Sequence, residues 1–126
     1  MSVSRDSIRI LAVDDHPMFR EGLAMMLATQ PDMSLVAEAS NGQEAVQQFR
    51  QHRPDITLMD LQMPEMNGLD AMVAIRKEFP EAKIIILTTY ESDVQSAMKL
   101  GAQAYLLKTQ MHHELVGTIH SVHAVK

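Results

Sequence analysis

The sequence contains no cysteine, and this absence excludes two classes of protein. Without cysteine there is no disulfide framework of the kind that staples small secreted domains, and no thiolate metal site. A chain without cysteine suits the reducing cytosol, so we expect a cytoplasmic protein.

Basic residues are also few. Lysine and arginine together number 11, against 16 aspartate and glutamate residues, which gives a formal net charge of -5. Proteins bind nucleic acid largely through clustered Lys and Arg side chains that neutralise phosphates. We therefore expect no contact between this chain and DNA, except through a further domain outside the chain.

Long apolar runs are missing as well. No run reaches the roughly 18 residues of a membrane-spanning helix, and Met1–Ser7 lacks the apolar core of a signal peptide. We therefore expect no membrane partner. The 126 residues, of which 46% are hydrophobic and 21% charged, fit a loosely held tail at residues 1–7 and one globular domain at residues 8–126.

The sequence does contain a regular alternation of short apolar runs and amphipathic segments. The apolar runs predict five strands, at Ile8–Val13, Leu35–Ala39, Ile56–Asp60, Lys83–Leu87 and Ala104–Leu107. Apolar residues three and four positions apart predict helices from Pro17 to near Gln30, between Asn41-Gly42 and His52-Arg53-Pro54, and at Gly68–Phe79, Val94–Leu100 and His113–Val125. Gly101 fits a left-handed cap after the fourth helix.

Strands that alternate with helices require right-handed crossovers, and this predicts a parallel sheet with helices on both faces. All the strands then run in one direction, so their carboxyl ends meet at one edge, which is where ligands bind in open α/β sheets. The residues at these strand ends are Asp14 and Asp15, Asp60, Thr88 and Lys108.

Three carboxylates at one edge of a sheet repel one another. Two unit charges about 4 Å apart cost about 4 kcal/mol at an effective dielectric constant near 20. Protonation of one acid would relieve the repulsion, and so would Mg²⁺, which binds a few carboxylate or carbonyl oxygens together with water. A hydroxyl at Thr88 and an ammonium at Lys108 are instead suited to phosphoryl oxygens. Together, these groups indicate a site that takes up a phosphoryl group on an aspartate.

Taken singly, these residues have ordinary structural interpretations. Asp14 and Asp15 could cap and begin the following helix, and Asp60 could start an Asx-turn. Thr88 and Lys108 could simply be solvated ends of strands. Their meeting at one edge of the sheet favours the functional interpretation.

The histidines invite a separate metal hypothesis. His113, His120 and His123 could share one face of the last helix, but no carboxylate or cysteine completes a ligand set with them. A solvated helix surface is therefore the favoured interpretation. His16, directly after the two acids, is expected to be exposed.

Four sequence motifs carry a resemblance to a known family. The segments VDDHP, MDLQMPEMNGL, LTTY and GAQAYLLK resemble the motifs of the receiver domain of bacterial two-component response regulators, over essentially all of Ile8–Val125. The segment DDHPMFREGL resembles the corresponding segment of the subfamily whose receivers are fused to a LuxR-like helix-turn-helix domain (NarL/FixJ-like). The resemblance implies a flavodoxin-like, doubly wound five-stranded parallel sheet of order 2-1-3-4-5 with helices on both faces.

The resemblance also implies a role for each site residue. Asp60 would accept the phosphoryl group from the phosphohistidine of a sensor histidine kinase. Asp15, Asp60 and the backbone carbonyl of Gln62 would bind Mg²⁺ (or Mn²⁺) directly, with Asp14 acting mainly through a coordinated water. Thr88 and Lys108 would bind the phosphoryl oxygens.

The expected output is a change of conformation. Tyr105 resembles the aromatic residue that turns inward when Thr88 moves toward the phosphate, and it could equally be an edge aromatic packed on the last helix. In this subfamily the apolar faces of the first and last helices can belong to the core or to a dimer interface, and the sequence leaves both uses open.

The chain departs from the family at one position. The family commonly has proline after the lysine, joined by a cis bond, whereas Thr109 follows Lys108 here. Because a cis bond before a residue other than proline costs about 2.5 to 4 kcal/mol, we expect either a trans bond or a strained one, and the sequence does not fix the orientation of Lys108.

The leading hypothesis is a phosphorylatable signalling switch, not an enzyme, that controls dimerisation and a transcriptional output domain outside this chain. The alternative is a pseudo-receiver that acts without phosphorylation, against which the complete set of site residues argues. A phosphohydrolase with an aspartate nucleophile would have a DxD pattern after the first strand, and a flavodoxin-like carrier would have a Ser/Thr/Gly-rich loop there. The sequence has neither.

Overall fold

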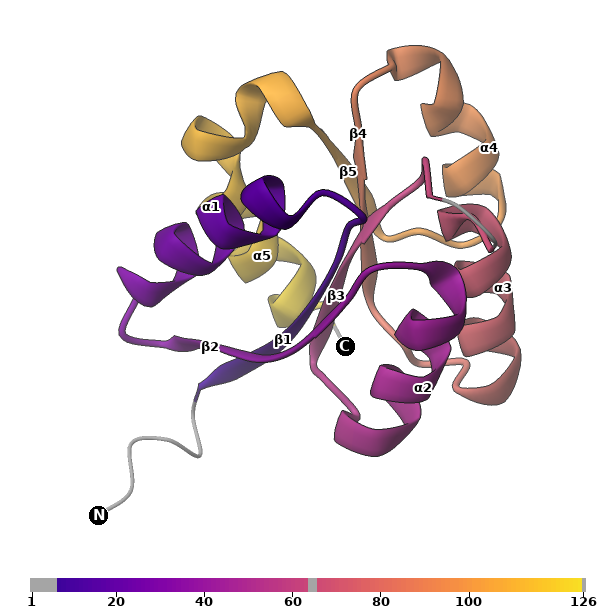
Figure 1. The fold of residues 1–126 in the computed structure, drawn as a ribbon, viewed down its shortest axis with the longest axis horizontal. Helices are drawn as coiled ribbons and strands as arrows, with labels where there is room; N and C mark the ends of the chain where they lie inside the picture. Colours follow the sequence, from indigo (N-terminus) through magenta and orange to yellow (C-terminus); the bar gives the residue numbers. More distant parts are fainter. Residues whose placement is uncertain (1–6, 64–65, 126) are drawn as a thin grey trace.

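The computed structural model describes residues 7–63 and 66–125, and it alternates strands with helices along the chain (Figure 1). The strands are β1 (Ile8–Val13), β2 (Met33–Ala39), β3 (Ile56–Asp60), β4 (Ile84–Thr88) and β5 (Ala104–Leu107). The helices are α1 (Pro17–Ala28), α2 (Gly42–His52), α3 (Gly68–Glu78), α4 (Val94–Lys99) and α5 (Met111–Ala124), with short 3₁₀ turns η2 (Glu91–Asp93) and η3 (Lys108–Gln110). The expected tail at residues 1–7 lies, except for Ser7, outside the described residues.

The five strands form one parallel sheet in the order β2-β1-β3-β4-β5, which confirms the predicted architecture. In the central strands β3 and β4 every residue is buried. This burial explains why their sequences are continuous apolar runs without polar alternation, since helices cover both faces. The order reverses on either side of β1 and β3, so the crevice at their carboxyl ends is a topological switch point.

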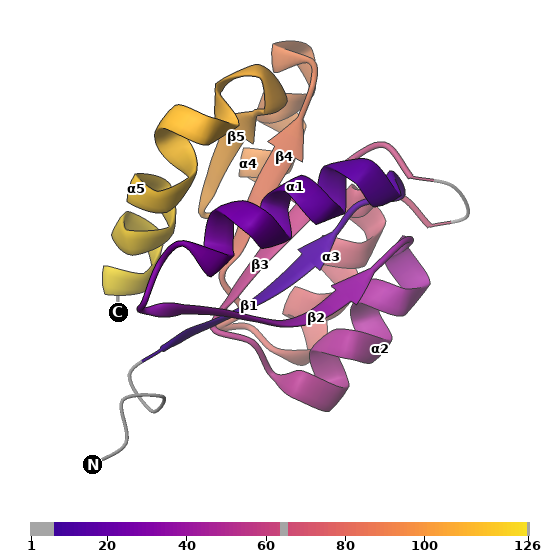
Figure 2. The same ribbon diagram turned by 60° about the vertical axis from the view of Figure 1, so that its left-hand side comes forward.

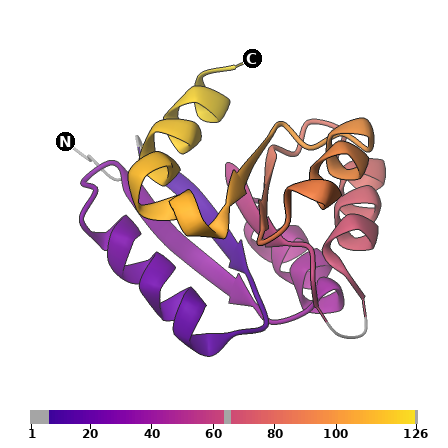
Figure 3. The ribbon, with the colours of Figure 1, turned by 90° about the horizontal axis from the view of Figure 1, so that it is seen from above.

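Helices α1 and α5 cover one face of the sheet, and α2, α3 and α4 cover the other (Figures 2 and 3). Alternate residues of β1, and likewise of β4, therefore enter two separate cores. In β1, for example, Ile10 packs with Leu23 and Leu115 on the α1/α5 side, whereas Leu11 packs with Phe49 on the other side. Both cores bury their residues almost completely, so the sheet is a rigid support for the loops at its edge.

The helix starts follow from the local sequence. Asn41 and Asn67 cap α2 and α3 through side-chain oxygens that accept hydrogen bonds from the N–H groups of Glu44 and Asp70. Pro17 stands at the start of α1, where its missing N–H is no loss. Gly101 has φ of 113°, which confirms the predicted left-handed position after α4.

The predicted boundaries differ from the observed ones by one or two residues. Strand β2 starts at Met33 and not at Leu35, because Met33 and Ser34 already pair with Ile8 and Arg9 of β1. Strand β4 is shifted by one residue and includes Thr88. Helix α5 begins at Met111, which is buried on the α5 side of the sheet, and not at His113. The two 3₁₀ turns were not predicted.

Among the residues that the structure describes, no helix is both long and apolar enough to cross a membrane.

Candidate functional site

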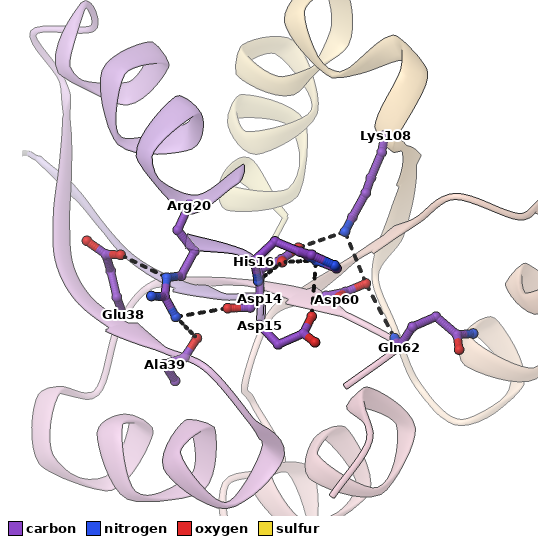
Figure 4. Close-up of polar contacts among 9 residues, drawn as sticks. All are labelled: Asp14, Asp15, His16, Arg20, Glu38, Ala39, Asp60, Gln62 and Lys108. Atoms are coloured by element: carbon purple, nitrogen blue, oxygen red, sulfur yellow. Dashed lines mark hydrogen bonds and ion pairs between the residues drawn. The ribbon is translucent and has the colours of Figure 1, made fainter. Parts of the chain in front are cut away.

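The acids at the ends of β1 and β3 lie together at the carboxyl edge of the sheet (Figure 4). Asp14 and Asp60 are fully buried, and their neighbour Asp15 is partly exposed. The N–H of Asp14 donates to the carbonyl of Ala39 at 3.0 Å, which fixes the end of β1 against β2. The sequence prediction that these three carboxylates meet is therefore confirmed.

Gly68 holds the segment after Asp60 close to the sheet. Its N–H donates to the carbonyl of Leu61 at 3.1 Å. A Cβ atom at this position would overlap the backbone carbonyl of Asp60, so a larger residue would displace the loop. The glycine in the motif thus positions the start of α3 directly against the end of β3.

Lys108 reaches both buried acids from the end of β5. Its Nζ lies 2.7 Å from Asp14 Oδ2 and 3.4 Å from Asp60 Oδ1, and it also sits 4.4 Å from the centre of the Phe19 ring. The Lys108–Thr109 bond is trans, and the chain turns at once into η3. The sequence left the orientation of Lys108 open, and the structure shows that its ammonium contacts the acids although the bond to Thr109 is trans.

The charge balance around Asp60 is unfavourable despite this ammonium. Burial, followed by the negative charge of Asp14, raises the pKa of Asp60 from its ordinary 3.8 to about 6. Lys108 and the N–H of Gln62, which donates to Asp60 Oδ1 at 3.3 Å, act in the opposite direction. A further positive charge at this site would therefore be stabilising at neutral pH.

Two oxygens of the acidic cluster are buried without a hydrogen-bond donor among the described residues: Asp15 Oδ1 and Asp60 Oδ2. Both belong to a group, Asp14, Asp15, His16 and Asp60, whose ligand atoms all lie within 4.8 Å of one another. Asp14 differs, because its Oδ1 accepts from the N–H of His16 and its Oδ2 from Lys108. Unpaired carboxylate oxygens fit a hard divalent cation such as Mg²⁺, which Asp15 and Asp60 could bind directly.

Thr88 and Tyr105 lie in β4 and β5 as the sequence predicts, but the hydroxyl of Thr88 bonds to the backbone of Tyr90 and Tyr105 is partly exposed. Thr88 ends β4 and is buried, and its hydroxyl donates to the carbonyl of Tyr90 and accepts from the Tyr90 N–H, both at 3.2 Å. Tyr105 lies in β5 with 38% of its surface exposed. The side chain of Gln62 extends away from Asp60 (Figure 4). Its amide donates to Asp93 at 3.2 Å.

The structure also brings in two residues that the sequence did not assign to the site. His16 is exposed, as expected, but its ring Nδ1 contacts Asp14 and Asp15. Arg20 donates to the carbonyl of Asp14 at 2.9 Å and lies 3.3 Å from Glu38. The sequence position of Arg20, one helical turn after His16, could have indicated its contact with the site, because residues four apart lie on the same face of a helix.

The histidines of α5 behave as a surface. His120 pairs with Asp32 at 2.7 Å, and the rings of His112 and His113 lie with their centres 4.4 Å apart, tilted by 41°. Within the described part of the chain, the acidic cluster at the sheet edge is the single group of three or more ligand-type residues close enough for a metal ion. This supports the surface interpretation of the histidines.

Comparison with known proteins gives a consistent result. The family model described as "Response regulator receiver domain" matches residues 10–120. The chain is 42% identical over 113 residues to the uncharacterized transcriptional regulatory protein YhcZ of Bacillus subtilis, covering 88% of this chain and 53% of that protein. It is 36% identical over 123 residues to the nitrate/nitrite response regulator protein NarL of Escherichia coli, covering 96% and 57%.

Solved structures agree. A LuxR-family two-component response regulator from Aurantimonas has a TM-score of 0.90 and 36% identity, with 94% of this chain and 86% of that chain covered. The response regulator domain of Thermotoga maritima CheB has a TM-score of 0.89 and 30% identity, with 95% and 98% covered. The chain thus spans about half the length of the curated relatives it matches, and nearly all of the isolated domain.

Proposed function

Because this chain belongs to the response regulator receiver domain family and its relatives are regulators of the NarL and LuxR type, we propose that it is a phosphorylatable switch with Asp60 as the phosphoacceptor. One observation carries the proposal. Asp60 is buried at the end of β3, with the ammonium of Lys108 3.4 Å from its Oδ1, while its Oδ2 has no donor in the described structure.

The chemistry proposed for Asp60 is a direct displacement at phosphorus. An oxygen of the Asp60 carboxylate forms a bond to phosphorus as the P–N bond of a kinase phosphohistidine breaks, and the electron pair stays on the imidazole nitrogen, which takes up a proton. When bound, Mg²⁺ (or Mn²⁺) would neutralise the carboxylates of Asp15 and Asp60 and the phosphoryl oxygens. Asp14 orients Lys108, whose ammonium would then donate to an oxygen of the transferred group.

The chain would assist this transfer to itself and its slow reversal by water, and it would have no separate substrate to turn over. In that sense it is a signalling phosphoacceptor and not an enzyme. The kinase partner supplies the phosphoryl group, and the residues of this chain supply the nucleophile and the electrostatic environment.

The proposed switch uses Thr88 and Tyr105. The hydroxyl of Thr88 would exchange its contacts with the backbone of Tyr90 for a phosphoryl oxygen, and the half-exposed Tyr105, which pairs with Ile86 in the sheet register, would follow inward. Phosphorylation would then shift the population toward a second arrangement of β4, α4 and α5.

The output is proposed to be transcriptional. Relatives about twice as long carry names such as transcriptional regulatory protein, so DNA contact would belong to a part of the protein beyond this receiver domain. Self-association would be the means of control. The exposed apolar side chains Met18 and Met25 on α1 support a dimer contact on that helix.

Incubation of the native chain with Mg²⁺ and a small acyl phosphate is expected to add one acid-labile phosphoryl group, detected by intact-mass spectrometry. Chelation of the divalent ion should prevent the addition. If the native chain gains no mass at any Mg²⁺ concentration, the pseudo-receiver alternative replaces the switch.

Magnesium is also expected to stabilise the fold by mass action. A ligand that binds the folded state at 100 times its Kd adds about 2.7 kcal/mol to the free energy of unfolding. The melting midpoint of the native chain should therefore rise with Mg²⁺, and Asp15→Ala should remove this rise because it deletes an unpaired carboxylate oxygen of the cluster.

The matched control is Asp70→Ala, since Asp70 is an exposed acid in the first turn of α3 and does not belong to the cluster. This variant should retain the Mg²⁺-dependent rise. A midpoint that is unchanged by saturating Mg²⁺ in the native chain would argue against the metal site.

A further inference from the structure

His16 has an unusual position for an exposed side chain, because its ring faces the acidic cluster. Its Nδ1 lies 3.0 Å from Asp14 Oδ1 and 3.1 Å from Asp15 Oδ1, while 65% of the side chain remains exposed (Figure 4). His16 is the N-cap residue of α1, yet within the described chain its side chain makes no capping hydrogen bond. The ring is thus turned toward the carboxylates and not toward the helix.

The backbone holds the ring in this place. The N–H of His16 donates to Asp14 Oδ1 at 2.8 Å, and the next residue, Pro17, starts α1 with a fixed φ. Arg20, one turn later, ties α1 to the carbonyl of Asp14. The position of His16 relative to the acids is therefore set by the β1 to α1 turn.

The contact with Asp15 is not a hydrogen bond. Although His16 Nδ1 is 3.1 Å from Asp15 Oδ1, that oxygen accepts no hydrogen bond from any described residue. Nδ1 is also at hydrogen-bonding distance, 3.0 Å, from Asp14 Oδ1, and its role there depends on which ring nitrogen carries the proton. With the proton on Nε2, Nδ1 presents a lone pair to the carboxylates, and a shared cation would remove the resulting repulsion. Neighbouring ligands of an octahedral ion with bonds of about 2.1 Å are about 3.0 Å apart. This matches the 3.1 Å between His16 Nδ1 and the unpaired Asp15 Oδ1.

We propose that His16 is an additional metal ligand of this site, through Nδ1, and that it makes the site favour an ion that accepts imidazole nitrogen, such as Mn²⁺, over Mg²⁺. The inference rests on the proposed function, because it concerns the same metal site. Imidazole suits transition metals, whereas Mg²⁺ prefers oxygen ligands and keeps its water. The imidazole would then carry its proton on Nε2.

Geometry beyond the acids supports the assignment. His16, Asp14, Asp15 and Asp60 offer one ligand atom each within a 4.8 Å group. Asp60 contributes a buried, unpaired Oδ2, and Asp15 an unpaired Oδ1, as seen for the part of the chain that the structure describes. The side chains of His16 and Asp15 are 65% and 28% exposed, so the cluster borders solvent on this side.

The test uses Mn²⁺ itself as the probe, at pH 8, where an ordinary imidazole is neutral. Electron spin-echo envelope modulation of Mn²⁺ bound to the native chain should show a directly coordinated nitrogen, and His16→Gln should abolish it. The loss of free Mn²⁺ signal on titration gives the Mn²⁺ affinity, and competition by Mg²⁺ gives the Mg²⁺ affinity. Loss of a ligand should weaken Mn²⁺ binding about tenfold and change Mg²⁺ binding less than about twofold.

The matched control is His113→Gln, an exposed histidine of α5, which should retain the nitrogen signal and both affinities. Mn²⁺ that binds the native chain without coordinated nitrogen would overturn the role of His16 and leave the proposed function standing. Nitrogen coupling that persists in His16→Gln would overturn it too, because another histidine would then be the ligand. A native chain that binds neither ion would overturn both the inference and the proposed metal site.

Discussion

Replacing Asp60 with asparagine is expected to abolish phosphoryl uptake from a small acyl phosphate in the presence of Mg²⁺. An amide does not attack phosphorus at neutral pH, and the substitution also removes one of the two unpaired carboxylate oxygens of the cluster. The loss should be complete when uptake is followed by intact-mass spectrometry. Asp70→Asn makes the same chemical change at an exposed acid of α3 and should take up one phosphoryl group like the native chain.

The loss of uptake will not reflect unfolding, because Asp60→Asn is expected to be more stable than the native chain when divalent ions are chelated. The pKa of Asp60 is raised from 3.8 to about 6 in the folded protein. The unfolded state therefore gives up this proton more readily, so native stability falls as the pH rises from about 4 to about 6.

Above pH 6 the neutral asparagine should raise the free energy of unfolding by at most about 3 kcal/mol, and the gain should fade as the pH falls toward 4. Urea denaturation at pH 8 and pH 4.5 measures it. A variant that is less stable than the native chain at pH 8 would contradict the assigned electrostatics of Asp60.

Replacing Lys108 with methionine is expected to have the opposite effect on stability. The substitution keeps an apolar stem beside Phe19 but removes the charge that lies 2.7 Å from Asp14 and 3.4 Å from Asp60, both of which are buried. A buried carboxylate without its partner is destabilising by several kcal/mol, so we expect a loss of about 2 to 3 kcal/mol at pH 8 in chelator. The loss should shrink as the pH falls below about 6, because Asp60 then takes up a proton and needs no counter-charge.

Two comparisons isolate this effect. Lys77→Met, at an exposed lysine of α3, should change stability by less than about 0.5 kcal/mol. Adding Asp60→Asn to Lys108→Met should recover much of the loss, because the double variant has one buried charge fewer. A Lys108→Met loss that is the same at pH 8 and pH 4.5 would mean that packing, and not charge, holds Lys108 in place. Phosphoryl uptake by Lys108→Met should also be strongly slowed.

The sequence predicts the fold well because its strands are buried on both faces. Runs such as Ile84–Leu87 have no polar alternation, and in a chain of alternating strands and helices this is compatible only with a covered parallel sheet. Because the strands of a parallel sheet share one direction, the sequence also predicts that Asp14, Asp15 and Asp60 lie at the same edge of the sheet. The start of β2 was placed two residues late because Ser34 interrupts the apolar pattern, whereas pairing with β1 fixes the strand.

The parts of the site that the sequence could not predict depend on side-chain orientation. Sequence spacing places Lys108 at a strand end, but its reach to Asp14 follows from the trans bond and the turn η3. The hydroxyl of Thr88 bonds with the backbone of Tyr90, and this choice between partners a few ångströms apart has no signature in the sequence. His16 was expected to be exposed, which is correct, but its contact with the acids arises from the turn before Pro17.

In the proposed function, Asp60 carries the phosphoryl group. The most direct test is tandem mass spectrometry of the native chain after incubation with Mg²⁺ and a small acyl phosphate as donor. The aspartyl phosphate formed on the protein is trapped chemically before digestion, so that the modified residue can be identified. We predict a single modified residue, Asp60. Modification at any other residue, or an unmodified Asp60 in a chain that has gained a phosphoryl group, would contradict the account.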